Sequence, residues 1–196
     1  MEQNELKKLL EAFLFVSSSP VQAARIKALF GVDEKAVETA FEELKTKYAS
    51  DDTSLRVIKV AEGYRLSTSP EVAPYIRKFF KDQRPRLSRA SLETLSVIAY
   101  KQPVTRSDVE SIRGVNVEGP LGTLLERGLI RIAGRKDAPG RPILYGTTRL
   151  FLEHFGLNTL RDLPLLNEFK EEDLTEEEKA KAGRLREANN EPSQTS

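Results

Sequence analysis

The stretch KQPVTRSDVESIRGV, from Lys101 to Val115, has the pattern of the second helix and turn of a helix-turn-helix. A segment that lies 83 residues earlier, PVQAARIKALFGV from Pro20 to Val32, aligns without gaps with PVTRSDVESIRGV. The apolar positions agree at the same offset, since Ile26 falls on Val109. Self-similarity at a fixed offset is the signature of a repeated structural unit. The sequence therefore predicts a duplicated fold.

The first copy predicts three helices followed by a β-hairpin. Gly31 can adopt a positive φ at the end of the second helix, and the Asp33 side chain can cap the third. Residues 54–69, SLRVIKVAEGYRLSTS, are rich in β-formers and predict two strands with Glu62 and Gly63 at the turn. Three helices and a hairpin make a winged helix. The apolar face of the first helix holds Leu6, Leu9, Leu10, Phe13 and Leu14, and that of the third holds Val37, Ala40, Phe41, Leu44 and Tyr48.

The second copy repeats this order in a shorter form. Helices are predicted over 91–101, 107–113 and 117–128, and the turn-rich GRKDAPGRP at 134–142 predicts a wing. The predicted fold class is mainly α with small β-hairpins, an α+β arrangement of two tandem winged-helix domains. The expected boundaries are an N-terminal domain at 1–82, a basic linker at 83–90, a C-terminal domain at 91–169 and a charged, disordered tail at 170–196.

Two further helices are predicted outside the repeated unit. Between the copies, residues 71–89 predict a helix that closes the first domain and then a basic connector. RLFLEHFG at 149–156 predicts a helix after the second wing. The next stretch, LNTLRDLPLL at 157–166, has two interpretations: its leucines fold back over their own domain, or they are presented to a partner. These leucines are Leu160, Leu163 and Leu166.

Charge is distributed unevenly along the chain. Residues 1–76 carry 10 basic and 12 acidic side chains, residues 77–149 carry 15 and 7, and residues 150–196 carry 6 and 11. A helix-turn-helix that reads DNA needs Arg, Lys, Asn or Gln on the helix that enters the major groove. The third helix of the first copy is acidic instead, and that of the second, VEGPLGTLLERG, has almost nothing to contact a base with. The pattern favours a DNA-binding fold used for something else.

The basic side chains cluster in the connector and in the second wing. Such a cluster can attract phosphates without sequence preference, although charge runs are more often solvated faces. A winged-helix transcription regulator that binds DNA is therefore the second functional hypothesis, and DNA contact is expected to be at most indirect or non-specific. The candidate phosphate contacts are Arg84, Arg86, Arg89, Arg135, Lys136 and Arg141.

The composition argues against an enzyme. The chain has no Cys and one histidine, His154, which excludes a thiolate metal site and a metal site with two histidines from one chain. His154 lies at a predicted helix end, where a structural role is favoured over general-base work. The loop GRKDAPGR lacks the GxxxxGK[ST] order that cradles phosphates. No catalytic residue, cofactor or metal is expected, so an interaction protein is favoured.

The location is expected to be cytoplasmic. The N-terminal MEQNELKKLLEAFLF places acidic residues ahead of a short apolar stretch, unlike a signal peptide. No apolar run approaches the roughly 20 residues that span a bilayer.

Two long motifs of the second copy resemble those of one bacterial family. LETLSVIAYKQPVTRSDVESIRGVN at 92–116 and LGTLLERGLIRIAGRKDAPGRPILYGTTRLFLEHFGLNTLRDLPLL at 121–166 closely resemble the segregation and condensation protein B family. In the first copy the likeness is one of layout, with EAFLFVSSSPV at 11–21 similar to the family's N-terminal opening. The resemblance implies two winged-helix domains and homodimerisation through the N-terminal one. It also implies that the protein binds the kleisin ScpA and, through ScpA, SMC. The protein would then be a non-enzymatic accessory subunit of the bacterial condensin that acts at the nucleoid.

With that resemblance in view, the second domain is the expected kleisin-binding domain. An amphipathic kleisin segment is expected to lie in a groove there, and Gly119 and Gly122 would permit close backbone approach. The candidate contacts are polar or aromatic residues at loops and helix ends, for which capping or local packing is the alternative role. They are Tyr100, Gln102, Thr105, Arg113, Asn116 and Tyr145.

Overall fold

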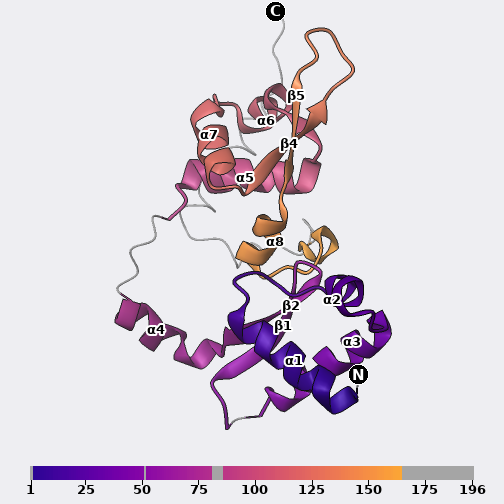
Figure 1. Ribbon diagram of the computed structural model, residues 1–196. Coiled ribbons are helices and arrows are strands. Elements are labelled where there is room, and N and C mark those ends of the chain that lie inside the picture. The colour runs from indigo at the N-terminus through magenta and orange to yellow at the C-terminus, as the bar shows by residue number, and fades with distance from the viewer. Residues whose placement is uncertain (1, 51, 81–85, 165–196) are drawn as a thin grey trace, which may run out of the picture. The chain divides into compact units, whose positions relative to one another are not determined.

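A computed structural model describes residues 2–50, 52–80 and 86–164 (Figure 1). Its helices and small antiparallel sheets follow the predicted order, and the predicted fold class is confirmed. Met1–Arg161 form one compact unit. The domain boundaries expected from the sequence stay predictions, and the predicted tail lies outside the described residues.

The first winged helix consists of three helices and a two-stranded hairpin, followed by a short 3-10 turn and a fourth helix. The third helix begins as expected, because the Asp33 side chain accepts a hydrogen bond from the backbone of Ala36. The elements are α1 (Gln3–Val16), α2 (Ala23–Phe30), α3 (Glu34–Lys47), β1 (Leu55–Val60), β2 (Gly63–Thr68), η1 (Pro70–Val72) and α4 (Ala73–Phe80).

The second winged helix has a third strand, which the sequence pattern did not predict. Figure 1 shows the long loop between β4 and β5, the second wing, extending beyond the helices of this domain. The sheet order is β3-β5-β4, with both pairs antiparallel. The elements are α5 (Arg89–Lys101), β3 (Val104–Thr105), α6 (Arg106–Arg113), α7 (Glu118–Glu126), β4 (Ile130–Arg135), β5 (Ile143–Thr147), α8 (Arg149–Phe155) and η2 (Leu160–Asp162).

The duplication is visible in the backbone at equivalent positions. Gly31 ends α2 at φ 66° and Gly114 ends α6 at φ 68°, and these two glycines are 83 residues apart. Val21 forms an isolated antiparallel bridge with Tyr64, and Val104, again 83 residues on, pairs with Tyr145 in the same sense. In both copies the chain that enters the second helix is thus tied to the second strand of the wing.

The cores form where the helical periodicity placed them. In the first domain Phe41 is fully buried and its ring stacks on that of Tyr64 at a centroid distance of 4.3 Å. The second domain buries Leu95, Leu124 and Ile130 in the same way. Burying a large apolar side chain contributes roughly 1.5–3 kcal/mol each. The first core cluster comprises Leu6, Leu10, Leu14, Val21, Ala23, Ile26, Val37, Ala40, Phe41, Leu44, Val57 and Tyr64.

Two turns differ from their predicted positions. The hairpin turn of the first domain is formed by Ala61 and Glu62, both at positive φ, whereas Gly63 is the first residue of β2. In the second wing, β4 continues through Arg135, so the predicted wing begins too early. At Gly63 the absence of a side chain leaves room for the neighbouring Pro20–Val21 segment instead.

Candidate protein-interaction surfaces

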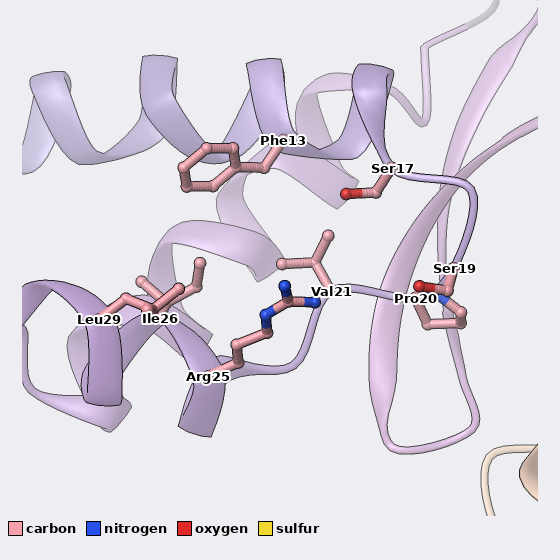
Figure 2. A pocket seen from close by; sticks show the side chains of 8 residues that line it. All are labelled: Phe13, Ser17, Ser19, Pro20, Val21, Arg25, Ile26 and Leu29. Atoms are coloured by element: carbon pink, nitrogen blue, oxygen red, sulfur yellow. The ribbon is translucent and has the colours of Figure 1, made fainter.

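An apolar groove lies between α1 and α2 of the first domain. It encloses a cavity of about 120 Å³. Figure 2 shows the Phe13 ring pointing from α1 towards α2, with Ile26 and Leu29 facing it and Val21 between the two helices. The groove, as the term is used below, is lined by Phe13, Ser17, Ser19, Pro20, Val21, Arg25, Ile26 and Leu29.

The segment SSSPV positions one wall of this groove. The Val21 amide donates a 2.8 Å hydrogen bond to the Tyr64 carbonyl, and the Tyr64 amide donates a 2.9 Å bond to the Val21 carbonyl. This bridge brings Pro20 against Gly63, where an added Cβ would lie 3.0 Å from the Pro20 Cβ and 3.0 Å from the Val21 oxygen. Only glycine fits this close approach without a shift of the backbone.

Large apolar side chains extend the groove along the surface. Phe30 stacks on Phe13 at a ring-centroid distance of 5.8 Å, but 44% of Phe30 and 64% of Leu29 stay exposed. At the end of α1, Phe15 and Val16 are also 79% and 72% exposed, but neither lines the groove. An apolar patch of this kind on a soluble domain marks an interaction site.

Helix α4 presents a second apolar surface. Tyr75, Phe79 and Phe80 are 75%, 82% and 71% exposed, and none of the helix's residues is buried. The sequence predicted a helix here that closes the first domain. The helix exists, but its aromatic side chains do not pack into that domain's core.

The third helix of the first domain is the place where a DNA-reading protein would present cations. Here Glu42 accepts a 2.9 Å hydrogen bond from the Tyr64 hydroxyl, and Glu43 pairs with Lys7 at 2.9 Å. Burial raises the pKa of Tyr64, and its hydrogen bond to Glu42 raises that pKa further, so the hydroxyl stays protonated and donates. An exposed acidic face repels a phosphate backbone.

In the second domain, most of the predicted kleisin contacts have structural roles. The Gln102 side chain bridges to Thr147: its Nε2 donates to Thr147 Oγ1 at 2.9 Å, and its Oε1 accepts from the Thr147 amide at 2.7 Å. Thr105 is buried and caps α6 by accepting from the Asp108 amide at 3.2 Å. Tyr145 is buried in β5.

Arg113, at the end of α6, also acts within its own domain. Its guanidinium donates to the Ala90 carbonyl at 3.1 Å and to Thr94 Oγ1 at 2.9 Å, and it pairs with Glu93. Only 12% of the Arg113 side chain is exposed. Tyr100 is half-buried, and Asn116 is exposed and accepts from the Glu118 amide at 2.9 Å. Asn116 is therefore the candidate contact that lies most openly on the surface.

The loop that contains Asn116 borders a shallow groove at the turn between α6 and α7. Its walls include Ser107, Ser111 and Asn116. Val115, in the same turn, also lines this groove and is 53% exposed. Polar side chains beside an exposed apolar one suit the docking of an amphipathic helix.

Gly119 and Gly122 lie on α7, a few residues after Asn116, which lines this groove. A Cβ added at either position would meet no atom within 4 Å. Within the described part of the chain, neither position is a glycine because of close packing, and both leave backbone open to an approaching partner.

The predicted phosphate contacts are mainly exposed, but several form ion pairs or hydrogen bonds within the chain. Arg89 pairs with Glu93 at 3.0 Å, and Lys136 lies 3.8 Å from Asp108. Arg135 donates to the Arg141 carbonyl at 3.0 Å. Arg86 is exposed, and Arg84 lies outside the described residues. Contact with phosphate stays a prediction for all six.

The residues that the structure describes contain neither a candidate metal site nor a candidate membrane span. Within 2–50, 52–80 and 86–164, no group of three His, Cys, Asp or Glu side chains could hold a metal ion. In the same residues no helix combines the length and apolarity that a membrane crossing requires. His154 is exposed in the last turn of α8.

The leucine-rich segment after α8 is only partly described. Leu160 is 40% exposed in η2, Leu163 is half-buried, and Leu166 lies outside the described residues. Both interpretations of this segment therefore stay predictions.

Comparison with known proteins relates most of the chain to one family. The family described as "Segregation and condensation complex subunit ScpB" matches residues 8–166. Segregation and condensation protein B of Moorella thermoacetica is 48% identical over 165 residues, which cover 84% of this chain and 85% of that protein. The protein of the same name from Syntrophotalea carbinolica is 46% identical over 171 residues, which cover 87% of each.

Solved structures give a similar result by sequence. ScpB from Mycobacterium tuberculosis is 40% identical, covers 81% of this chain and 99% of its own, and has a TM-score of 0.39. A dimer of an ScpB N-terminal domain complexed with ScpA peptide is 25% identical, covers 39% and 95%, and has a TM-score of 0.37. The sequence identities relate these chains to the present one.

Proposed function

Because the chain belongs to the segregation and condensation protein B family, we propose that it is a non-enzymatic accessory subunit of the bacterial condensin. It forms a homodimer, binds the kleisin ScpA, and through ScpA acts on SMC at the nucleoid in chromosome condensation and segregation. The observation that carries this proposal is the family match over residues 8–166. One relative supports the partners, since an ScpB N-terminal domain is known as a dimer complexed with ScpA peptide.

The surfaces of the two domains support a protein partner rather than DNA. The helix that would enter the major groove is acidic in the first domain and carries two open glycines in the second. Exposed Val115, which lines the α6–α7 groove, gives it an apolar anchor point. A kleisin helix that lays its apolar face over this side chain would find the glycines of α7 open to approach.

Binding of the full chain to full-length kleisin from the same cell tests the proposal. We expect defined stoichiometric binding in isothermal titration calorimetry. Val115→Asp should weaken it more than tenfold, because a buried charge opposes an apolar contact. Leu150→Asp, which places the same charge at a 48% exposed apolar position of α8, is the matched control and should bind normally.

Two results would contradict this function. A chain that ignores the kleisin would reject the accessory-subunit proposal. Sequence-selective DNA binding that survives physiological salt would instead favour the transcription regulator, since purely electrostatic contacts weaken steeply as salt rises.

A further inference from the structure

Among the residues that the structure describes, none covers the apolar face of helix α4. It is eight residues long, and Tyr75, Phe79 and Phe80 are all more than two-thirds exposed. The Phe79 and Phe80 rings meet edge to face at 5.1 Å but cover little of each other. Isolated helices of this length are unstable in water, and most helical stability comes from packing of an amphipathic face. We therefore expect the aromatic face of α4 to pack against a partner surface.

The groove between α1 and α2 has a cavity and exposed apolar side chains that an apolar partner could cover. Its cavity of about 120 Å³ is lined by Phe13, Val21, Ile26 and Leu29, and the apolar surface continues to Phe30. Leu29 is 64% exposed although it lies next to buried Ile26. An apolar side chain laid between Phe13 and Leu29 would fill the cavity and shield both.

The connectivity separates the helix from the groove of its own domain. The groove borders Val21, which is tied to Tyr64 near the turn of the hairpin. Helix α4 follows from the opposite end of β2, where Thr68 pairs with Leu55, and it packs chiefly against η1. Four residue steps along the strand, about 13 Å, separate Tyr64 from Thr68. Each chain therefore carries one open helix and one open groove.

We propose that α4 of one copy docks in the α1–α2 groove of a second copy, and that the second copy returns the same contact. This inference rests on the homodimer of the proposed function and names the surfaces that form it. A reciprocal exchange of this kind closes on itself with two-fold symmetry, so it stops at a dimer. A second copy is favoured as the occupant because it supplies helices and grooves in equal number.

The area of the exchange fits a stable dimer. An aromatic side chain buries about 150–250 Å², so three of them offer roughly 400 Å² per helix at the observed exposure. The helix covers an equal area of groove surface, so one helix–groove contact buries about 800 Å² in total. The dimer has two such contacts, which together bury about 1,600 Å². Specific, stable interfaces bury about 1,200–2,000 Å².

Complementation between two variants of the full chain tests the exchange. Phe79→Asp damages the helix and Leu29→Asp damages the groove. Each variant alone should be monomeric in light scattering, but their equimolar mixture should dimerise, more weakly than the natural chain, because one of the two helix–groove contacts is still intact. Lys78→Asp on α4 and Ala24→Asp on α2 are matched controls and should stay dimeric. Far-UV circular dichroism confirms that all four fold.

Disulfide trapping identifies the contact directly, since the natural chain has no Cys. Leu29→Cys and Phe79→Cys proteins, when mixed and oxidised, should form a covalent heterodimer. A covalent dimer of Phe79→Cys alone would mean that α4 pairs with α4, and an internal disulfide in the double variant would mean that the helix folds onto its own groove. Either result overturns the exchange.

The remaining outcomes separate this inference from the proposed function. If Leu29→Asp and Phe79→Asp stay dimeric and bind kleisin normally, the exchange is wrong and the accessory-subunit function stands. If both stay dimeric but lose kleisin, the groove belongs to the kleisin and the exchange is again wrong. If the unaltered chain neither dimerises nor binds kleisin, the proposed function fails as well.

Discussion

Gln102 and Thr147 are joined by three hydrogen bonds across the second domain. The Gln102 amide nitrogen donates to the Thr147 hydroxyl, while the Gln102 carbonyl oxygen accepts from both the hydroxyl and the backbone amide of Thr147, at 3.0 Å and 2.7 Å. The same Nε2 also donates to the Ala99 carbonyl at 3.1 Å. Gln102 thus ties the end of α5 to the end of β5.

Replacing Gln102 by Ala should destabilise the second domain by about 1–3 kcal/mol, because the amide of buried Thr147 loses its acceptor. Urea denaturation of the full chain measures this loss. Lys101→Ala, at the exposed neighbouring position, is the control and should change the unfolding free energy by less than about 0.5 kcal/mol. Equal stability of Gln102→Ala and the natural chain would return Gln102 to the group of candidate partner contacts.

Gly63→Ala should destabilise the first domain by about 1–3 kcal/mol, because the new methyl group would press on Pro20 and on the Val21 carbonyl. The variant should also disturb the groove that these residues line. Thermal unfolding followed by circular dichroism measures the effect. A variant as stable as the natural chain would show that the Pro20 segment moves aside freely.

Gly122→Ala should have opposite effects on stability and on binding. Alanine favours a helix by about 0.5–1 kcal/mol over glycine, and the position has space for a methyl group, so α7 should become more stable. If a kleisin helix approaches this backbone closely, the same methyl group should weaken its binding. Chemical denaturation and calorimetry on one preparation measure both. Tighter or unchanged kleisin binding would place the partner elsewhere.

The ion pair of Glu11 predicts a dependence of stability on pH. The hydrogen bond from Lys47, reinforced by that from Tyr48, lowers the pKa of Glu11 below its ordinary value. Since the folded pKa lies below the unfolded one, the stabilisation is complete above the unfolded pKa and is lost as the pH falls through the folded pKa.

Comparing Glu11→Gln with the natural chain isolates this contribution. The gap in unfolding free energy between the two proteins should be largest near neutral pH and should shrink below pH of about 4. Urea denaturation at a series of pH values provides the curve. A gap that stays constant across the series would show that Glu11 gains nothing from its charge.

Much of the fold could be predicted because short-range signals agree with one another. Asp33 caps α3, Gly31 ends α2 in the left-handed region, and the apolar periodicity placed Phe41 in the core. The strand β3 was missed because two residues, Val104 and Thr105, are too few to show a strand's alternation. Such a strand is defined by its pairing with β5, which lies far away in the sequence.

The interaction sites were harder to predict, because a side chain's partners depend on tertiary packing. Gln102 and Arg113 were chosen as polar residues at element ends, but polar side chains at those positions also satisfy backbone groups of their own domain. The exposed aromatic residues of α4 went unnoticed because an amphipathic helix looks the same whether its apolar face is covered or open. One signal was available: the run KFF places two adjacent phenylalanines on a short helix.

The two copies join the wing to its helices to different extents. In backbone pairing, the described residues of the first copy have the single bridge of Val21 with Tyr64, whereas the second copy extends the equivalent contact to the two pairs of β3 with β5. Local opening needs less free energy where fewer backbone bonds must break together. Amide hydrogens at Val21 and Tyr64 should therefore exchange with solvent sooner than those at Val104 and Tyr145, which makes the first domain the easier of the two to remodel when a partner arrives.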